Sequence, residues 1–308
     1  MLWLTVTISF YFILSIVFLV DKYLLTGAIA SPKVYTFYVG ALGILILAII
    51  PFVGFYIPSF SQIVLALFAG AIYIFALFWF YKALNLFEAS RIVPAISGLV
   101  PLFTFGLVFV SFFGKERLLF SEIIAFSLLI LGTFLMVFKK EKFISLESFK
   151  ISTICAFLLS LSFVLLKYVY LAQSFWTGFI WTKIGGFLMA ICFFVFTKEI
   201  KEEIFKQKVS LKKKTIRIFI ANQAAGGAAN VLQNWAFSLV PLAYVAIINA
   251  LQGMQYVFLL IFTVFLSLTQ PLWAKEAGLK EEISKEIIFQ KIIAILLIGG
   301  GLVLLAFK

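Results

Sequence analysis

Carboxamide side chains recur at helical spacing in two apolar segments of the C-terminal half. Asn230 and Gln233 are three residues apart, and Asn249, Gln252 and Tyr256 follow the pattern i, i+3, i+7, so each set is predicted to share one helix face. Amides donate and accept hydrogen bonds without net charge, which suits a zwitterionic or hydroxylated solute. The alternative is that they join packed helices. Their number favours a polar substrate-binding cavity.

A lysine lies well inside another apolar segment. Lys183 stands about eight residues, or roughly 12 Å, into a predicted span that begins at Phe175. It either extends to the membrane interface or faces the cavity, where it would bind a carboxylate or a phosphate. Trp79 and Tyr11 are candidates for the cavity wall, with helix packing as the alternative. Lys167, at the end of a predicted span, is interpreted as an interfacial anchor.

The residues needed for most enzymatic chemistry are missing. The chain has no histidine, and Asp21 is its one aspartate. Histidine metal sites, histidine-based triads and aspartyl pairs are therefore excluded, so we expect no enzyme, no metal and no other cofactor. No carboxylate is expected deep inside a span. A cationic drug would then lack a counter-ion, which favours facilitated diffusion or exchange of a neutral, zwitterionic or anionic metabolite.

The composition sets the environment of these side chains. The 308 residues are 64% hydrophobic and 12% charged, with a mean hydropathy of +1.16. A soluble domain has about 25% charged residues, so the solvent must be lipid. Long apolar runs without alternation predict an all-α membrane protein rather than a barrel. The net charge of +12 lies in loops, so the expected partners are the bilayer and a small-molecule metabolite, and not nucleic acid.

Ten transmembrane helices are predicted, because a span needs about 20 mostly apolar residues. In chain order they are Leu2–Val20, Val34–Val53, Gln62–Tyr81, Arg91–Phe113, Phe120–Phe138, Ile151–Tyr170, Phe175–Thr197, Thr215–Leu239, Leu242–Leu268 and Ile287–Phe307. Most of the 25 lysines and arginines lie in loops that follow odd-numbered spans. These loops are expected in the cytoplasm, which places both termini outside a multi-pass protein of the cell membrane.

The second half of the chain resembles the first. Ile123-Ile124-Ala125 and Gly132 recur as Ile292-Ile293-Ala294 and Gly301, in the same order. We divide the chain into a first unit over 1–139, a cytoplasmic linker over 140–150 and a second unit over 151–308. Five spans per unit force the second unit to enter from the opposite face, which predicts two inverted five-helix repeats. The sequence leaves open whether the protein is a monomer or a homodimer.

The stretch from Tyr81 to Val137 resembles the EamA family of the drug/metabolite transporter superfamily. The matching positions are Ala83-Leu84, Pro101, Gly114-Lys115-Glu116-Arg117 and Gly132. In the second half Met254 stands where the family has its proline, and a long charged loop replaces the turn. The resemblance implies an exporter or exchanger of small metabolites such as amino acids, working by alternating access. A flippase for lipids or lipid-linked sugars on the same scaffold is the alternative.

Overall fold

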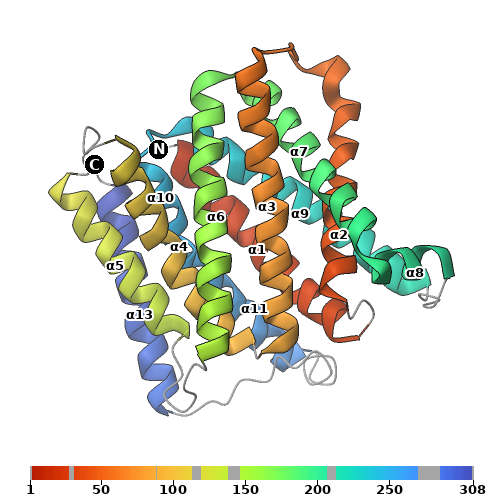
Figure 1. The fold of residues 1–308 in the computed structure, drawn as a ribbon. Coiled ribbons are helices and arrows are strands. Elements are labelled where there is room, and N and C mark those ends of the chain that lie inside the picture. Colours follow the sequence, from red (N-terminus) through yellow and green to blue (C-terminus); the bar gives the residue numbers. More distant parts are fainter. Residues whose placement is uncertain are drawn as a thin grey trace.

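The protein is a bundle of helices (Figure 1). The computed structural model describes residues 2–27, 31–87, 89–112, 119–137, 146–206, 213–269 and 285–306, and no strand occurs among them. The turn at Gly114–Arg117 and residues 140–145 of the proposed linker lie outside these ranges. The helices are α1 (Leu2–Gly27), α2 (Pro32–Leu42), η1 (Gly43–Phe52), α3 (Phe60–Leu86), α4 (Ala89–Phe112), α5 (Phe120–Val137), α6 (Leu146–Ala172), α7 (Phe175–Phe196), α8 (Lys198–Lys206), α9 (Lys213–Leu239), α10 (Tyr244–Ala250), α11 (Gly253–Thr269) and α13 (Lys285–Ala306).

Seven helical stretches are long and apolar enough to cross a bilayer, which confirms the prediction of a helical membrane protein. They are Leu2–Asp21, Pro32–Phe52, Phe60–Leu86, Leu146–Ala172, Phe175–Phe196, Tyr244–Phe265 and Phe289–Ala306. α4 and α5 contain shorter apolar stretches, at Ala95–Ser111 and Phe120–Leu135. α9 is more polar because the carboxamides lie along it.

Two helical features were not expected from the apolar runs. α1 continues past Val20 to Gly27, because no residue that breaks a helix precedes that glycine. The charged loop after α7 contains the amphipathic helix α8. α8 is joined to α2 by an ion pair in which Lys33 Nζ lies 3.0 Å from Glu199. Lys201 Nζ also donates a hydrogen bond of 2.7 Å to the backbone oxygen of Val195, near the end of α7.

The predicted span over Leu242–Leu268 contains an apolar stretch long enough to cross a bilayer, at Tyr244–Phe265, but its helix is interrupted between α10 and α11. Backbone bonds with i to i+3 spacing join Gln252 to Asn249 and Met254 to Leu251 at the interruption. A Cβ built on Gly253 would lie 2.3 Å from Thr133 Oγ1, so α5 occupies the space next to the turn. Thr133 Oγ1 also lies 3.5 Å from the carbonyl oxygen of Ala250, which is a backbone group next to the interruption. The hydroxyl can therefore donate a hydrogen bond to it.

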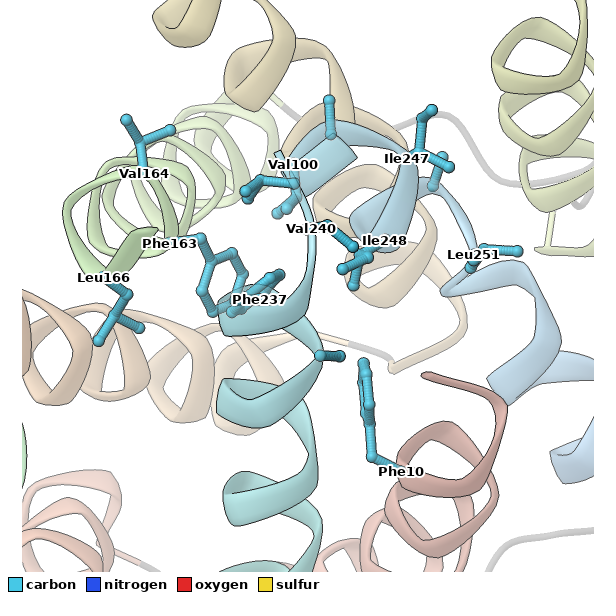
Figure 2. Close-up of a cluster of buried hydrophobic side chains, with 14 of the residues drawn as sticks. Phe10, Val100, Phe163, Val164, Leu166, Phe237, Val240, Ile247, Ile248 and Leu251 are labelled. Carbon is cyan, nitrogen blue, oxygen red and sulfur yellow. The ribbon is translucent and has the colours of Figure 1, made fainter. Parts of the chain in front are cut away.

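The largest core cluster surrounds α10. Figure 2 shows Phe163 of α6 against Phe237 of α9, with Val240, Ile248 and Phe10 close by. The rings of Phe163 and Phe237 have centroids 5.2 Å apart. Phe10, Phe237 and Ile248 are fully buried. The short helix α10 is therefore held inside protein, where an interrupted span has no lipid contact to disfavour its free backbone groups.

Glycines let α3 and α7 touch backbone to backbone. A Cβ on Gly70 would lie 1.8 Å from the carbonyl oxygen of Thr182, and one on Gly185 would lie 2.1 Å from that of Leu67. Real Cβ atoms do not approach backbone oxygen so closely, so only glycine fits at either position. The α3–α7 contact is consequently one of the closest in the molecule.

The start of α1 and the end of α13 lie on the same side of the helix bundle. Tyr244 contacts Trp3 near the start of α1, with ring centroids 5.5 Å apart. It also donates a hydrogen bond to Glu122 at the start of α5. α13 runs antiparallel to α5, so the end of α13 returns to the side where α1 begins, as Figure 1 shows.

Replacing Tyr244 with phenylalanine is expected to destabilise the protein by about 1–3 kcal/mol, because it removes a donor from a buried carboxylate. Glu122 is 3% exposed, and its Oε2 accepts a 2.6 Å hydrogen bond from the backbone nitrogen of Leu119. Thermal unfolding in detergent measures the effect. Tyr56→Phe is the control, since Tyr56 is 45% exposed and its hydroxyl makes a 3.4 Å contact to Ser174. Equal melting temperatures for both variants would contradict the prediction.

Candidate functional site

A cavity of about 290 Å³ lies inside the bundle. Its walls come from α1, α2, η1, α3, α6, α7, α9, α11 and the turn before α11, so both halves of the chain contribute. The polar residues that line it are Asp21, Tyr73, Tyr81, Thr182, Lys183, Asn222, Gln223, Asn230, Gln233, Asn234, Gln252 and Gln255. Polar side chains gathered around a cavity within an apolar helix bundle are the kind of site expected for a solute that crosses a membrane.

Four of the residues predicted from the sequence line this cavity. Lys183 lies on α7, Asn230 and Gln233 lie on α9, and Gln252 lies in the turn before α11. Asn230 Nδ2 is 3.4 Å from the hydroxyl of Tyr73 on α3. The spacing of Asn230 and Gln233 therefore places both on the cavity face of one helix. Their binding of a substrate stays a prediction.

The other four predicted residues do not line the cavity. Asn249 Nδ2 donates a 3.0 Å hydrogen bond to Thr104 Oγ1. The hydroxyl of Tyr11 donates a 2.9 Å hydrogen bond to the carbonyl oxygen of Ile248. Tyr256 bonds to Ser97, and Lys82 Nζ lies 4.8 Å from the ring centroid of Trp79. The predicted residues that contact protein instead of the cavity are therefore Asn249, Tyr11, Tyr256 and Trp79.

The interruption before α11 explains why one carboxamide set is divided. Asn249 lies on α10, Gln252 lies in the turn and Tyr256 lies on α11. Asn249 and Tyr256 still face the same neighbour, because they bond to Thr104 and Ser97 of α4. Gln252 alone of the three lines the cavity.

Asp21, at the end of the apolar stretch Leu2–Asp21, is a carboxylate in the cavity wall that the sequence did not predict. Asp21 lies on the extension of α1, where its Oδ1 accepts a 2.6 Å hydrogen bond from Asn222 of α9 and another from the hydroxyl of Tyr35 of α2. Gln223 Nε2 lies 3.3 Å from the same hydroxyl. These bonds fix Oδ1, whereas Oδ2 has no hydrogen-bond partner among the described residues.

Lys183 is the cationic side chain of the cavity wall. Its Nζ lies 5.1 Å from the ring centroid of Phe179, one turn earlier on α7. Within the described part of the chain, its ammonium group has no carboxylate within ion-pair distance. A half-buried ammonium without a counter-ion is energetically unfavourable in an apolar bundle, which marks it as a group that gains from an anionic ligand.

Lys167 is not an interfacial anchor. Its side chain is 2% exposed, and its Nζ lies 3.4 Å from the carbonyl oxygen of Ser238, near the C-terminal end of α9. The last carbonyl groups of a helix have no partner within the helix, and a cation there is favourable. Lys167 therefore joins α6 to the end of α9 inside the protein.

Asp21 and Lys183 lie at different levels of the cavity. Asp21 is beside Tyr35 on α2, whereas the Cδ atom of Lys183 is 3.7 Å from a Cβ built on Gly43, where α2 ends. Tyr35 and Gly43 are separated by eight residues, or about 12 Å along a helix. The two charges are therefore roughly 12 Å apart along the direction of α2.

Two other helices give the same separation. On α9, Asn222 bonds to Asp21, and Asn230 lies eight residues further on, beside Tyr73. On α3, the ring of Tyr81 is 4.8 Å from that of Tyr35 at the level of Asp21, while Tyr73 lies eight residues earlier. Gly70, three residues before Tyr73 on α3, lies against Thr182, next to Lys183 on α7, so Tyr73 and Asn230 lie near the Lys183 level.

The sequence did not indicate Asp21 as a cavity residue or Tyr35 as its hydrogen-bond donor. Both lie close to charged residues at the ends of apolar runs, where a polar side chain is expected to face water. The available signal was the absence of a helix-breaking residue between Val20 and Gly27, which would have extended the first helix through Asp21.

Comparisons with known proteins show the fold. No family model matches the chain, and no curated protein matches it. The chain is similar to a protein of known crystal structure, with a TM-score of 0.65 and 16% sequence identity, over 99% of this chain and 96% of the other. At that identity the similarity shows a shared fold. The two proteins therefore have the same helical architecture along nearly their whole lengths.

Proposed function

We propose that the protein is a membrane transporter that exchanges or exports a small zwitterionic metabolite by alternating access. The observation that supports this function is the cavity, which helices of both halves line with carboxamides, a carboxylate and an ammonium group. Such a cavity replaces the water around a polar solute. Its position between two halves of a helical bundle is typical of secondary transporters.

The proposed transporter has ten spans in two inverted repeats, of the type that the resemblance to the EamA family implies. α4, α5 and α9 supplement the seven apolar stretches, since α9 faces the polar cavity and needs fewer apolar residues. An even number of spans agrees with α1 beginning on the side where α13 ends. The basic loops then put both termini outside the cell membrane.

The contact between α5 and α13 supports the repeat. A Cβ on Gly132 would lie 3.0 Å from the carbonyl oxygen of Ala294, and one on Gly301 would lie 3.0 Å from that of Ala125. Ala125 and Gly132 are the positions that correspond to Ala294 and Gly301 in the sequence repeat. Gly132 meets Ala294, and Gly301, which corresponds to Gly132, meets Ala125, which corresponds to Ala294. Such reciprocal contacts are expected between two units related by a two-fold axis.

An asymmetry between the halves supports alternating access. In the proposed repeat, the pair α3 and α7 corresponds to the pair α9 and α2. α3 and α7 touch through backbone at Gly70 and Gly185, whereas a Cβ on Gly227 of α9 would meet nothing within 4 Å. In an inverted-repeat transporter, the closely packed helix pair separates while the corresponding loosely packed pair closes. This movement exposes the site first to one face of the membrane and then to the other.

Proteoliposomes test the proposed function. Vesicles loaded with amino acids, nucleotides, sugar phosphates or organic acids are expected to show saturable exchange for one class. Lys183→Ala and Gln252→Ala should reduce that exchange, since both side chains line the cavity. Lys82→Ala is the control, because Lys82 packs on Trp79 outside the cavity. The absence of saturable flux for every class would contradict a metabolite transporter.

A further inference from the structure

The cavity has two polar ends and a less polar middle. Asp21, Asn222 and Gln223 form one end, where Tyr35 bonds to Asp21 from behind the wall, and Lys183 lies at the other. Small and apolar residues line the wall between these levels. They are Val39, Gly40, Ile74, Leu77, Gly226 and Gly227.

The charges at the two ends do not neutralise each other. A separation of roughly 12 Å is far beyond the reach of an ion pair, which needs about 4 Å. Oδ2 of Asp21 has no hydrogen-bond partner among the described residues, and the ammonium group of Lys183 has no carboxylate partner there. Each end is therefore ready to bind one charge of a ligand.

The length of such a ligand follows from the geometry. A hydrogen bond at each end takes about 3 Å, which leaves roughly 6 Å between the charged groups of the ligand. The ammonium and carboxylate groups of a simple α-amino acid are joined by one carbon atom and do not span that distance. A flexible aliphatic chain of several methylene groups does, and it fits a middle section that offers few hydrogen bonds.

We propose that this cavity selects a solute with an ammonium group at one end, a carboxylate at the other and a short aliphatic chain between them. The ammonium group binds Oδ2 of Asp21, and the carboxylate binds Nζ of Lys183. An ω-amino acid, or an amino acid whose side chain ends in an amine, has this chemistry. The inference rests on the proposed transport function, because it assigns the substrate of that cavity.

The carboxamides agree with an amino acid at the Lys183 end. Asn230 Nδ2 lies 3.4 Å from the hydroxyl of Tyr73, and Asn234 Nδ2 lies 3.2 Å from Asn230 Oδ1, so the amides form a connected row on α9. Amide oxygens accept hydrogen bonds from an α-ammonium group, and amide nitrogens donate to a carboxylate. A ligand with an α-amino group at this end keeps all its polar atoms bonded.

Binding to the purified wild-type protein tests the inference without any substitution. Titration calorimetry is run with ε-aminocaproate and with two analogues of equal length, ε-hydroxycaproate without the amine and aminohexanol without the carboxylate. Removing a charge that makes a buried hydrogen bond is expected to weaken binding roughly tenfold to a hundredfold for each analogue. If either analogue binds as tightly as ε-aminocaproate, the inference is overturned.

Variants assign each end of the ligand. Asp21→Asn should remove the preference for ε-aminocaproate over ε-hydroxycaproate, and Lys183→Met should remove the preference over aminohexanol. Lys82→Met is the control and should retain both preferences, since Lys82 lies outside this cavity. Retention of both preferences in Asp21→Asn and Lys183→Met would overturn the assignment of the ends.

Flux measurements separate this inference from the proposed function. The protein could exchange a solute that lacks one of the two charges, at a rate that Asp21→Asn does not change. That result would overturn the inference about the substrate but would agree with the proposed transport function. Selective binding of ε-aminocaproate without flux of any solute supports the inference about the cavity and contradicts the proposed transport.

Discussion

A single methyl group at Gly70 is expected to separate α3 from α7 and to destabilise the protein by about 3 kcal/mol or more. The new Cβ would lie 1.8 Å from the carbonyl oxygen of Thr182 and 3.0 Å from the nitrogen of Gly186. Both atoms belong to the backbone, so no side-chain rotation relieves the overlap. The melting temperature of Gly70→Ala in detergent should therefore fall by several degrees.

Gly227→Ala is the matched control for this substitution. It adds the same methyl group to a helix of similar length, at a position where a Cβ would meet nothing within 4 Å. Alanine is the better helix former by about 1 kcal/mol, so this variant should be as stable as the wild type or slightly more so. Equal losses of stability in Gly70→Ala and Gly227→Ala would show that the α3–α7 contact is not the cause.

A covalent link between α3 and α7 is expected to stop transport almost completely. The rings of Phe78 on α3 and Phe193 on α7 have centroids 5.3 Å apart. Cysteines at both positions, in a Cys192→Ser background, can be joined by a short cleavable thiol-reactive reagent. If the two helices must part in each transport cycle, exchange in proteoliposomes falls at least tenfold after linking and returns after cleavage.

The link between α5 and α13 provides the control. A Cβ on Gly300 would lie 3.9 Å from Cδ1 of Leu128, so cysteines at these two positions can be joined by the same reagent. α5 and α13 meet across the proposed symmetry axis. A change between the inward-facing and outward-facing states should alter this contact least. Transport should continue in that linked pair. Wild-type flux with α3 and α7 linked would contradict alternating access by this movement.

Much of the architecture could be predicted from the sequence, because a bilayer constrains a chain strongly. Every predicted span overlaps a helix of the structure. The carboxamides Asn230 and Gln233 lie on the cavity face as their spacing indicated. Both results follow from helical periodicity and hydropathy, which are local properties.

The missed features depend on contacts between distant segments. The break before Gly253 lies where Thr133 of α5 approaches the chain from 120 positions earlier. Asp21 faces the cavity because Tyr35 and Asn222 donate hydrogen bonds to it from two other helices. Hydropathy along the sequence contains no information about these partners, so it assigned Asp21 to a loop.

The self-complementary contact between α5 and α13 has a genetic consequence. Gly132 approaches the backbone of Ala294, and Gly301 approaches that of Ala125 in the same way. A gene that encoded one half alone would already specify both surfaces of this contact. If the halves are the inverted repeats proposed above, two copies of that shorter product, inserted in opposite directions, would pair through the same contact. Duplication and fusion of such a gene would then require no new interface, only a connecting segment.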